Sequence, residues 1–390
     1  MEARELMKAE RYIRGLVVGA LAMAPMLVAH AAFRGHATDT DYNALLSSDP
    51  SLKGTAVDSC STCHRVGSVP DPEKPGAMRH ENYCEYCHSV YTYGKGDIRL
   101  TLNPFGVDYL AAGRGVGAIK AIAARDSDGD GAPNGAELAK STNPGDPASN
   151  PSARIAPSRV VSLADMEKLA ASVTQVMLMN TPVNLSGDSY DSYRGYRVGE
   201  LLSGVGISEE AESVDFISLD GFERTLTMDE VRGTWPQGAP VLGLGKADLG
   251  SCGWTQYNVK GLDPTRPLPD AGILLAFEED GARIASATID AKTGRIVGTG
   301  PLRLVAPQFH ASPPDMLPTA DKACLDSVDP KYHYHESYDH NGGKSAFSIV
   351  AVRINPLPAG TRDFDWQKAA GDSIAKEQIV FFGALTPRRD

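Results

Sequence analysis

The sequence predicts an α+β protein, in which a small loop-rich and helical part precedes a β-rich part. Glycine (39 residues) and proline (26) are frequent among the 390 residues, which is typical of chains with many turns. Asp-Gly pairs at 220–221 and 280–281 each separate two apolar runs, a strong signal for β-hairpins. The helical patterns lie earlier, within residues 106–142 and 163–179.

The composition excludes several classes of protein. Hydrophobic residues make up 42% of the chain, charged residues 22%, and the mean hydropathy is -0.24, as in soluble globular proteins rather than polytopic membrane proteins or disordered chains. This length predicts two or three domains of about 150 residues each. The formal charge of -11 makes nucleic acid an unsuitable partner, because phosphate binding needs a basic face.

Residues 1–32 have the pattern of a signal peptide. Basic residues precede an apolar run over 15–32, which contains the small-x-small cleavage pattern Ala29-His30-Ala31. An uncleaved anchor is the alternative, because the run is almost long enough to span a bilayer. We expect cleavage, a periplasmic or extracellular location, and no transmembrane segment in the mature chain.

Two Cys-x-x-Cys-His motifs lie in the expected dihaem segment, residues 33–105. The first consists of Cys60, Cys63 and His64, and the second of Cys84, Cys87 and His88. In c-type cytochromes the two thiols form thioethers to the haem vinyl groups and the adjacent imidazole ligates the iron. The motifs therefore predict two covalently bound haem c groups.

Zinc and disulfides are the alternatives for the same cysteines. The four cysteines alone have zinc-ribbon spacing, and each pair could instead form a disulfide. Haem is favoured because histidine follows both pairs in a chain that has 9 histidines. The export signal also places the motifs where c-type haem is assembled.

The second axial ligands of the haem irons are less defined. A second histidine gives a closed electron-transfer site, whereas an open position permits ligand chemistry. His80 lies between the motifs and His340 lies in a polar, aromatic segment, so these two are the distal candidates. The remaining cysteines, Cys252 and Cys324, are expected to form a disulfide in an oxidising compartment, with a metal-ligating thiolate as the alternative.

An acidic loop within residues 106–147 matches the EF-hand calcium pattern between two short helices. Gly131 occupies the sharp turn. The predicted oxygen ligands are Asp126, Asp128, Asp130, the carbonyl of Ala132, Asn134 and Glu137. A solvated acidic turn is the alternative. A calcium ion at this place would be structural, bracing the joint between the haem segment and a proline-rich linker at 148–160.

Residues 161–390 form the expected C-terminal domain. Ser162 is predicted to cap a helix over 163–179. Two hairpins with type I′ turns are expected, one over 214–226 and one over 273–289. Residues 349–354 and 379–382 are further strand candidates.

Part of this domain resembles the sulfite-oxidase-like molybdopterin-binding fold. The resemblance rests on 191–207, on Asp220-Gly221-Phe222 and on 300–305, and it covers roughly residues 185–310. It implies a β-rich scaffold of that family. No cysteine lies between Cys87 and Cys252, so the family's molybdenum ligand is missing and molybdopterin is not expected.

The whole chain is also similar to a family of exported dihaem proteins named for a Gly-Glu-Gly-Pro motif. After the two haem motifs, the matching features are Gly298-Thr299-Gly300-Pro301, 339–343, 352–358 and Phe364-Asp365-Trp366. Thr299 stands in place of the naming glutamate, so any role of that carboxylate is lost. The resemblance implies a haem carrier joined to a sulfite-oxidase-like domain.

These observations predict an exported dihaem c-type cytochrome that carries electrons between redox partner proteins. An acidic surface favours partners with basic docking faces. The alternatives are a haem-fed oxidoreductase that uses the C-terminal domain as its catalytic module, and a docking module of a larger redox complex.

Overall fold

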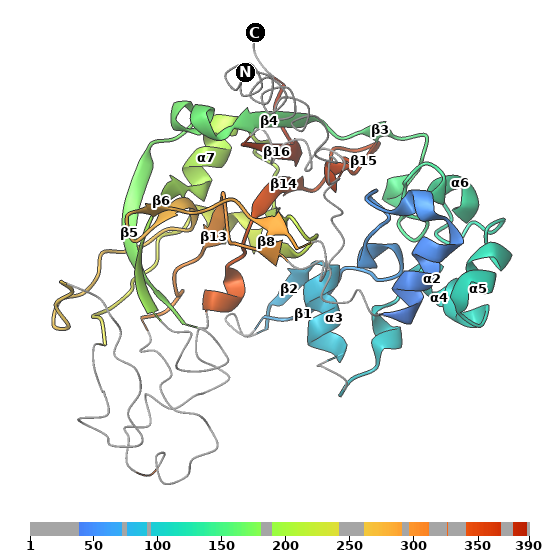
Figure 1. Cartoon of the computed structure of the whole chain (residues 1–390), viewed down its shortest axis with the longest axis horizontal. Coiled ribbons are helices and arrows are strands. Elements are labelled where there is room, and N and C mark those ends of the chain that lie inside the picture. The colour runs from blue at the N-terminus through green and yellow to red at the C-terminus, as the bar shows by residue number, and fades with distance from the viewer. Residues whose placement is uncertain are drawn as a thin grey trace, which may run out of the picture.

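A computed structural model describes residues 39–71, 76–91, 95–180, 189–241, 261–290, 296–311, 326, 341–367 and 377–387 (Figure 1). The expected signal peptide, the pair Cys252 and Cys324, and His340 lie outside these residues. Within the described part of the chain, no helix has both the length and the apolar character needed to cross a membrane.

The structure confirms the α+β class. Short helices gather on one side of the molecule and two five-stranded sheets lie on the other (Figure 1). The helical side contains α2 (Thr40–Ser48), α3 (Tyr83–Tyr91), α4 (Pro104–Ala111), α5 (Gly115–Ala121) and α6 (Asn134–Leu138). It also contains the hairpin of β1 (Gly67–Pro70) and β2 (Met78–Glu81), with 3-10 turns at Pro50–Leu52, Cys60–Thr62, Ile98–Thr101 and Pro147–Ser149.

One small core joins most of the helical side. Residues that precede the first haem motif contribute Leu45, Leu52 and Val57, and α4 contributes Phe105. The helices around the acidic loop add Ile119, Ile122 and Leu138 to the same cluster. The acidic loop and the first haem motif are therefore attached to one packed unit, because its members bury their apolar faces against each other.

The two large sheets account for most of the remaining strands. The first has the order β10 (Ala282–Arg283), β9 (Leu274–Glu279), β6 (Ser189–Arg197), β5 (Ser172–Met179), with β13 (Arg303–Val305) also paired to β9. The second has the order β4 (Ser158–Ser162), β16 (Gln378–Gly383), β14 (Ile349–Asn355), β7 (Ser213–Ser218), β8 (Glu223–Thr227). The pair β14–β16 is parallel and the other pairs are antiparallel.

The second sheet is buried on both faces. Along β16, Ile379 and Phe381 enter the main core, which also receives α7 (Val198–Val205) and α8 (Met228–Arg232). Val380 and Phe382 point to the opposite face and pack with Trp366. This alternation explains the uninterrupted apolar run in β16, since a strand covered on both faces needs apolar residues at every position.

The helix predicted over 163–179 is wrong beyond its first turns. Ser162 does cap a helical segment, but this is a 3-10 helix over Leu163–Lys168, and β5 begins at Ser172. The run from Ser172 to Met179 pairs with β6 along its whole length. Its β-branched residues favour a strand, and the pairing with β6 outweighs the helical spacing of its apolar residues.

The two Asp-Gly turns differ. Asp280 and Gly281 both have positive φ, as a type I′ turn requires, and β9 and β10 flank them. At the first hairpin only Gly221 has positive φ, and its N–H donates to the Ser218 carbonyl at 2.9 Å. This is a three-residue connection with a glycine bulge, so the type I′ prediction is wrong there.

Other strand predictions are met in part. The candidates at 349–354 and 379–382 are confirmed as β14 and β16. The expected strand over 283–289 is interrupted: β10 ends at Arg283, and β11 (Thr288–Ile289) pairs instead with β12 (Ile296–Val297).

The proline-rich stretch at 148–160 is more ordered than a plain linker. It contains β3 (Arg154–Ile155), which pairs with β15 (Thr361–Arg362), and the start of β4, which pairs with β16. Strands at a sheet edge tolerate proline because one side of the backbone needs no partner. The stretch thus belongs to the edge of the C-terminal sheets.

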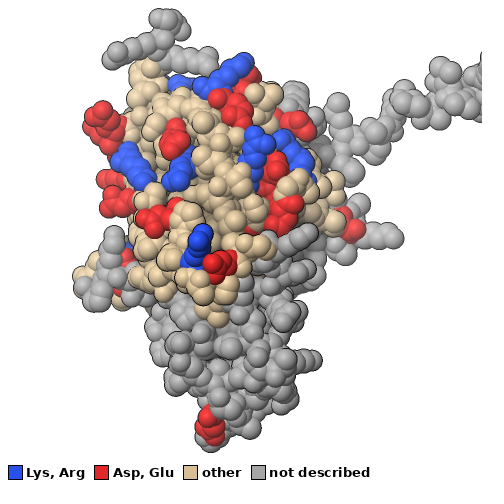
Figure 2. All heavy atoms as spheres, turned by 90° about the vertical axis from the view of Figure 1, so that its left-hand side faces the viewer, with Lys and Arg blue, Asp and Glu red and all other residues tan. Residues whose placement is uncertain are grey.

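The side of the molecule that carries β5 is seen face-on in Figure 2. Among the described residues of that face, basic and acidic side chains are interspersed (Figure 2). Ion pairs such as Arg194–Glu278, at 3.6 Å, reflect this mixture. The net negative charge of the chain is therefore not gathered into one acidic area on this face.

Asn341 ties three segments of the first sheet region together, and its loss should destabilise the fold. Its Nδ2 donates to the carbonyls of Leu178 (2.6 Å) and Ala306 (2.8 Å), and its Oδ1 accepts from the Asn180 N–H (2.7 Å) in a fully buried position. We expect Asn341→Ala to lower the free energy of unfolding by about 3 kcal/mol in urea denaturation, because three buried polar groups lose their partner.

The exposed Asn43 provides the matched control. Its side chain donates to the Asp39 carbonyl at the surface, so Asn43→Ala should cost less than about 1 kcal/mol. Equal losses in the two variants would contradict the role assigned to Asn341.

Candidate functional site

The first Cys-x-x-Cys-His motif forms a tight turn that Asn103 holds from outside. The 3-10 turn Cys60–Thr62 continues to His64, whose N–H donates to the Cys60 carbonyl at 2.9 Å. The buried Nδ2 of Asn103 donates to the carbonyls of Ser61 (2.9 Å) and Thr62 (3.0 Å). Because Asn103 also caps α4, the motif is fixed to the helical core.

The imidazole of His64 has a defined orientation. Its Nδ1 lies 2.7 Å from the Thr101 Oγ1, and this hydroxyl donates its own hydrogen to the Ile98 carbonyl at 2.7 Å. In this arrangement Nδ1 donates to the hydroxyl oxygen, which corresponds to the tautomer with the ring lone pair on Nε2. A metal-ligating histidine is oriented in the same way by a partner on its other nitrogen.

The second motif lies on α3. Cys84, Cys87 and His88 occupy positions i, i+3 and i+4, which share one face of a helix. The Asn82 Oδ1 accepts from the Glu85 N–H at 3.0 Å at the start of this helix. His88 is exposed. Two tethers and one ligand on a single helical face can engage one flat cofactor.

The two motifs lie close together. The Cys87 thiolate contributes to raising the pKa of Cys60, although burial is the main cause and brings that pKa to about 12. The Thr101 hydroxyl, which orients His64, also interacts with the Cys87 thiol. Cofactors tethered at the two motifs would therefore lie near one another.

The structure forms no disulfide at either motif. Cys60, Cys63, Cys84 and Cys87 all have free thiols. Across the part of the chain that the structure describes, the one group of at least three metal-ligating side chains within 4.8 Å of one another is a group of aspartates. The four cysteines therefore keep free thiols, and among the described residues they are not part of such a group.

Exposed apolar side chains surround the motifs, as a porphyrin site requires. Val66, Met78, Ile98 and Leu100 have exposed fractions of 49%, 62%, 43% and 58%. Val66 lies just before β1, Met78 begins β2, and Ile98 and Leu100 belong to the turn Ile98–Thr101, all in segments that adjoin the two motifs. A covalently tethered porphyrin has apolar faces, so covering such side chains would stabilise its attachment. The residues present therefore fit a haem at each motif.

The helix α3 is docked on strand β8 of the C-terminal domain. The Asn82 Nδ2 donates to the Glu223 carbonyl (2.9 Å) and to the Thr225 Oγ1 (3.1 Å). Glu85 pairs with Arg224 across the same contact. The second haem motif therefore touches the C-terminal domain directly.

A cavity of about 530 Å³ lies between the two parts of the molecule. His64 and His80 line it from the helical side, so the distal candidate His80 shares a cavity with the predicted proximal ligand. Residues of two segments that carry the family resemblance, Arg353 and Trp366, line the other side. The motif cysteines do not line this cavity.

Arg353 forms the centre of a buried ionic cluster in the cavity wall. Its Nε donates to Asp215 (2.8 Å), its Nη2 to Glu223 (2.5 Å) and its Nη1 to Asp363 (2.8 Å). Burial raises the pKa of Glu223 to about 7, and Arg353 opposes the rise. One guanidinium thus faces three carboxylates, and the cluster is negative when all three are ionised.

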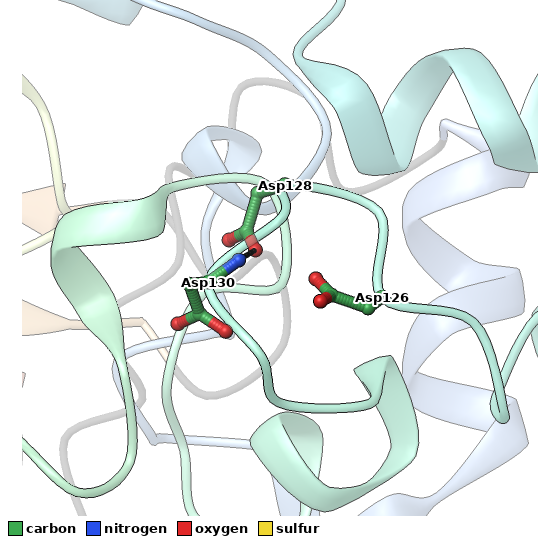
Figure 3. A group of neighbouring side chains, drawn as sticks. All are labelled: Asp126, Asp128 and Asp130. Atoms are coloured by element: carbon green, nitrogen blue, oxygen red, sulfur yellow. Dashed lines mark hydrogen bonds between the residues drawn. The ribbon is translucent and has the colours of Figure 1, made fainter.

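The acidic loop has the features of a cation site. The carboxylates of Asp126, Asp128 and Asp130 lie within 4.8 Å of one another, and Asp126 points across the loop toward the other two (Figure 3). Glu137 is completely buried, and both of its carboxylate oxygens lack a hydrogen-bond partner. Burial and the three aspartates raise the pKa of Glu137 to about 8. A buried, unpaired carboxylate is costly unless a cation compensates it.

Two other predicted calcium ligands lie differently. The Asn134 Oδ1 accepts from the Ser127 N–H (3.2 Å), and its Nδ2 donates to the Ile122 carbonyl (2.9 Å). Its side chain thus holds the loop closed. The N–H of Ala132, whose carbonyl is a predicted ligand, donates to the Asp130 side chain at 2.8 Å.

The comparisons with known proteins place no further constraint on the site. No protein-family model matches the chain, and neither the curated proteins nor the solved structures gave a match.

Sequence reasoning missed the residues that hold the motifs. The supporting residues lie outside the Cys-x-x-Cys-His pattern; they are Asn82, Thr101 and Asn103. The Asn103-Pro104 pair could have been recognised as a helix start, since asparagine is a favoured cap and proline a favoured first residue. No local signal indicates that the Asn103 amide reaches the turn of the first motif.

Calcium should stabilise the protein through the acidic loop. We expect added Ca²⁺ to raise the melting temperature and a chelator to lower it, because the ion compensates Glu137 and the aspartates. In Glu137→Gln, at least ten times more Ca²⁺ should be needed for the same rise in melting temperature. Glu210→Gln, at an exposed position, should leave the response unchanged. A response of equal size in both variants would show that the ion binds elsewhere.

In chelator, the free energy of unfolding should fall as pH rises. The folded-state pKa values of Asp128 (about 6) and Glu137 (about 8) are raised above their usual values, mainly by burial. Their protonated forms therefore stabilise the fold below about pH 4, and this stabilisation is lost as pH rises through 6 and 8. Urea denaturation with and without Ca²⁺ measures this pH dependence of the free energy of unfolding. A gain in stability between about pH 4 and pH 8 in the presence of chelator would contradict the role given to Asp128 and Glu137.

Proposed function

We propose that this chain is an exported dihaem c-type cytochrome that carries electrons between redox partner proteins in the periplasm or outside the cell. The observation that carries the proposal is the anchoring of His64: within a Cys-x-x-Cys-His motif, its Nδ1 is held by Thr101, an arrangement that corresponds to a lone pair on Nε2. A second motif places the same three residue types on one face of α3.

The chain's own residues have distinct parts in this proposal. Cys60, Cys63, Cys84 and Cys87 would tether the two porphyrins, His64 and His88 would be the proximal ligands, and His80 would be a distal ligand. A bound haem supplies a one-electron iron couple. Thr101 orients one imidazole and contacts a thiol of the other motif, which supports transfer between two neighbouring haems.

The acidic loop would hold a structural Ca²⁺. Asn150 supports this role, because its Nδ2 donates to the Asp130 carbonyl at 3.1 Å and so links the loop to the segment that leads into the sheets. The C-terminal part, with its two sheets, would be the sulfite-oxidase-like scaffold that the resemblance implies, without molybdopterin.

The proposal predicts two covalent haems per chain. Mass spectrometry of the purified mature protein should show two added haem masses and loss of the signal peptide, and a pyridine haemochrome assay should give two haems. The double variant Cys84→Ser/Cys87→Ser should retain one haem. A chain without covalent haem, or with bound zinc, would exclude the cytochrome assignment.

A haem-fed oxidoreductase is the second candidate, and the cavity favours it. His64, His80 and Arg353 line one cavity, where a small substrate could meet both parts of the molecule. Elemental analysis of the same preparation separates the candidates. A metal beyond two irons and calcium would support catalysis in the C-terminal domain, whereas its absence would support the electron carrier.

Thr101 should tune the haem at the first motif. A hydrogen bond from Nδ1–H makes the imidazole a stronger donor to iron and so favours the oxidised state. We expect Thr101→Val to keep two haems per chain but to raise one midpoint potential in a redox titration. Thr55→Val is the control, because the Thr55 hydroxyl donates to the Leu52 carbonyl and contacts neither motif. Unchanged potentials in Thr101→Val would contradict this role.

A further inference from the structure

Strand β8 brings a buried carboxylate against the second haem motif. Burial raises the pKa of the Cys84 thiol, the nearby Glu223 carboxylate adds to the rise, and an interaction with the Glu223 backbone N–H opposes it. The neighbouring Asn82 donates to the Glu223 carbonyl at 2.9 Å. Glu223 is therefore a residue of the C-terminal domain in direct contact with a haem tether, although its side chain is 3% exposed.

Several elements packed around Glu223 contribute charged or titratable groups that face it. Arg353 on β14 donates to its carboxylate, and Asp215 on β7 and Asp363 after β15 bind the same guanidinium. On α3 the facing titratable groups are Tyr83 and Cys84, with Glu85 paired to Arg224 beside them. His64 and His80 line the cavity on the opposite side.

Among these carboxylates, Glu223 is the one best placed to change protonation. Asp215 accepts hydrogen bonds from Thr225 (2.6 Å), Arg353 (2.8 Å) and Asn355 (2.7 Å), so its carboxylate oxygens are fully engaged. Burial raises the pKa of Glu223 to about 7, as it does that of Glu85, and it also raises the pKa of Asp363. Glu223 differs from both in lying beside Cys84 while it lines the cavity. Glu85 does not line this cavity.

We propose that Glu223 takes up a proton through the cavity when the iron of the haem tethered at Cys84 gains an electron. The inference rests on the proposed function. One electron from a donor protein converts Fe(III) to Fe(II), and one proton from solvent binds the Glu223 carboxylate. The added negative charge favours the protonated acid, so the two events stabilise each other. The C-terminal domain thereby couples electron transfer to proton uptake.

The holoprotein provides the test through redox potentiometry with dithionite from about pH 5 to pH 9. One midpoint potential should fall as pH rises near neutrality. The fall should be at most about 59 mV per pH unit, which corresponds to a tenfold change in equilibrium constant for one electron. In Glu223→Gln this fall should disappear. Glu210→Gln, at an exposed position, should behave as wild type.

Two further arms identify the proton acceptor. Glu85→Gln should retain the pH dependence, because Glu85 lies outside the cavity wall. Redox-difference infrared spectroscopy of the wild-type protein should show a protonated carboxyl band on reduction, and this band should be absent in Glu223→Gln. The wild-type measurement remains informative even where the variant does not fold. A pH dependence that persists in Glu223→Gln, as haem propionates would give, or that is lost in Glu85→Gln, overturns the inference. A wild-type protein without covalent haem overturns the proposed function instead.

Discussion

The contact between α3 and β8 is the interaction on which the relation between the two parts of the molecule depends. Asn82 caps the start of α3 with one side-chain group and binds β8 with the other, and Glu85 adds an ion pair to Arg224. The helix that carries the second Cys-x-x-Cys-His motif is thus fixed against a sheet that is buried on both faces. A rigid support of this kind would keep the geometry of a cofactor attached to α3 constant while its charge changes, as the proposed electron transfer requires.

The sequence indicates candidate cofactor-binding residues, but it does not indicate the residues that support them. The two Cys-x-x-Cys-His motifs and the acidic loop are local patterns, and the chemistry of their ligands constrains the spacing. Thr101 and Arg353 depend on long-range contacts. Thr101 lies 37 residues from His64 along the chain, and Arg353 lies 130 residues from Glu223. No local periodicity encodes such pairings, and only the packed fold brings them together.

The errors in secondary structure have the same origin. Residues 172–179 satisfy a helical spacing, yet they become β5 because β6 offers a partner along their full length. The two Asp-Gly pairs are identical as dipeptides, but Leu219 donates from its N–H to the Ser348 carbonyl, and this contact accompanies a three-residue turn at the first hairpin. The second Asp-Gly pair follows the local rule at Asp280 and Gly281. Local signals succeed where no distant partner competes with them.

The molecule contains two acidic clusters that are compensated differently, and the difference indicates what each does. In the cavity wall, a guanidinium within the chain satisfies Asp215, Glu223 and Asp363, so this cluster is complete without a ligand and only its protonation can vary. In the acidic loop, both oxygens of Glu137 lack hydrogen-bond partners. Burying such a group costs several kcal/mol unless a charge of opposite sign is present. The first cluster is therefore suited to respond to an electron nearby, and the second to hold a cation.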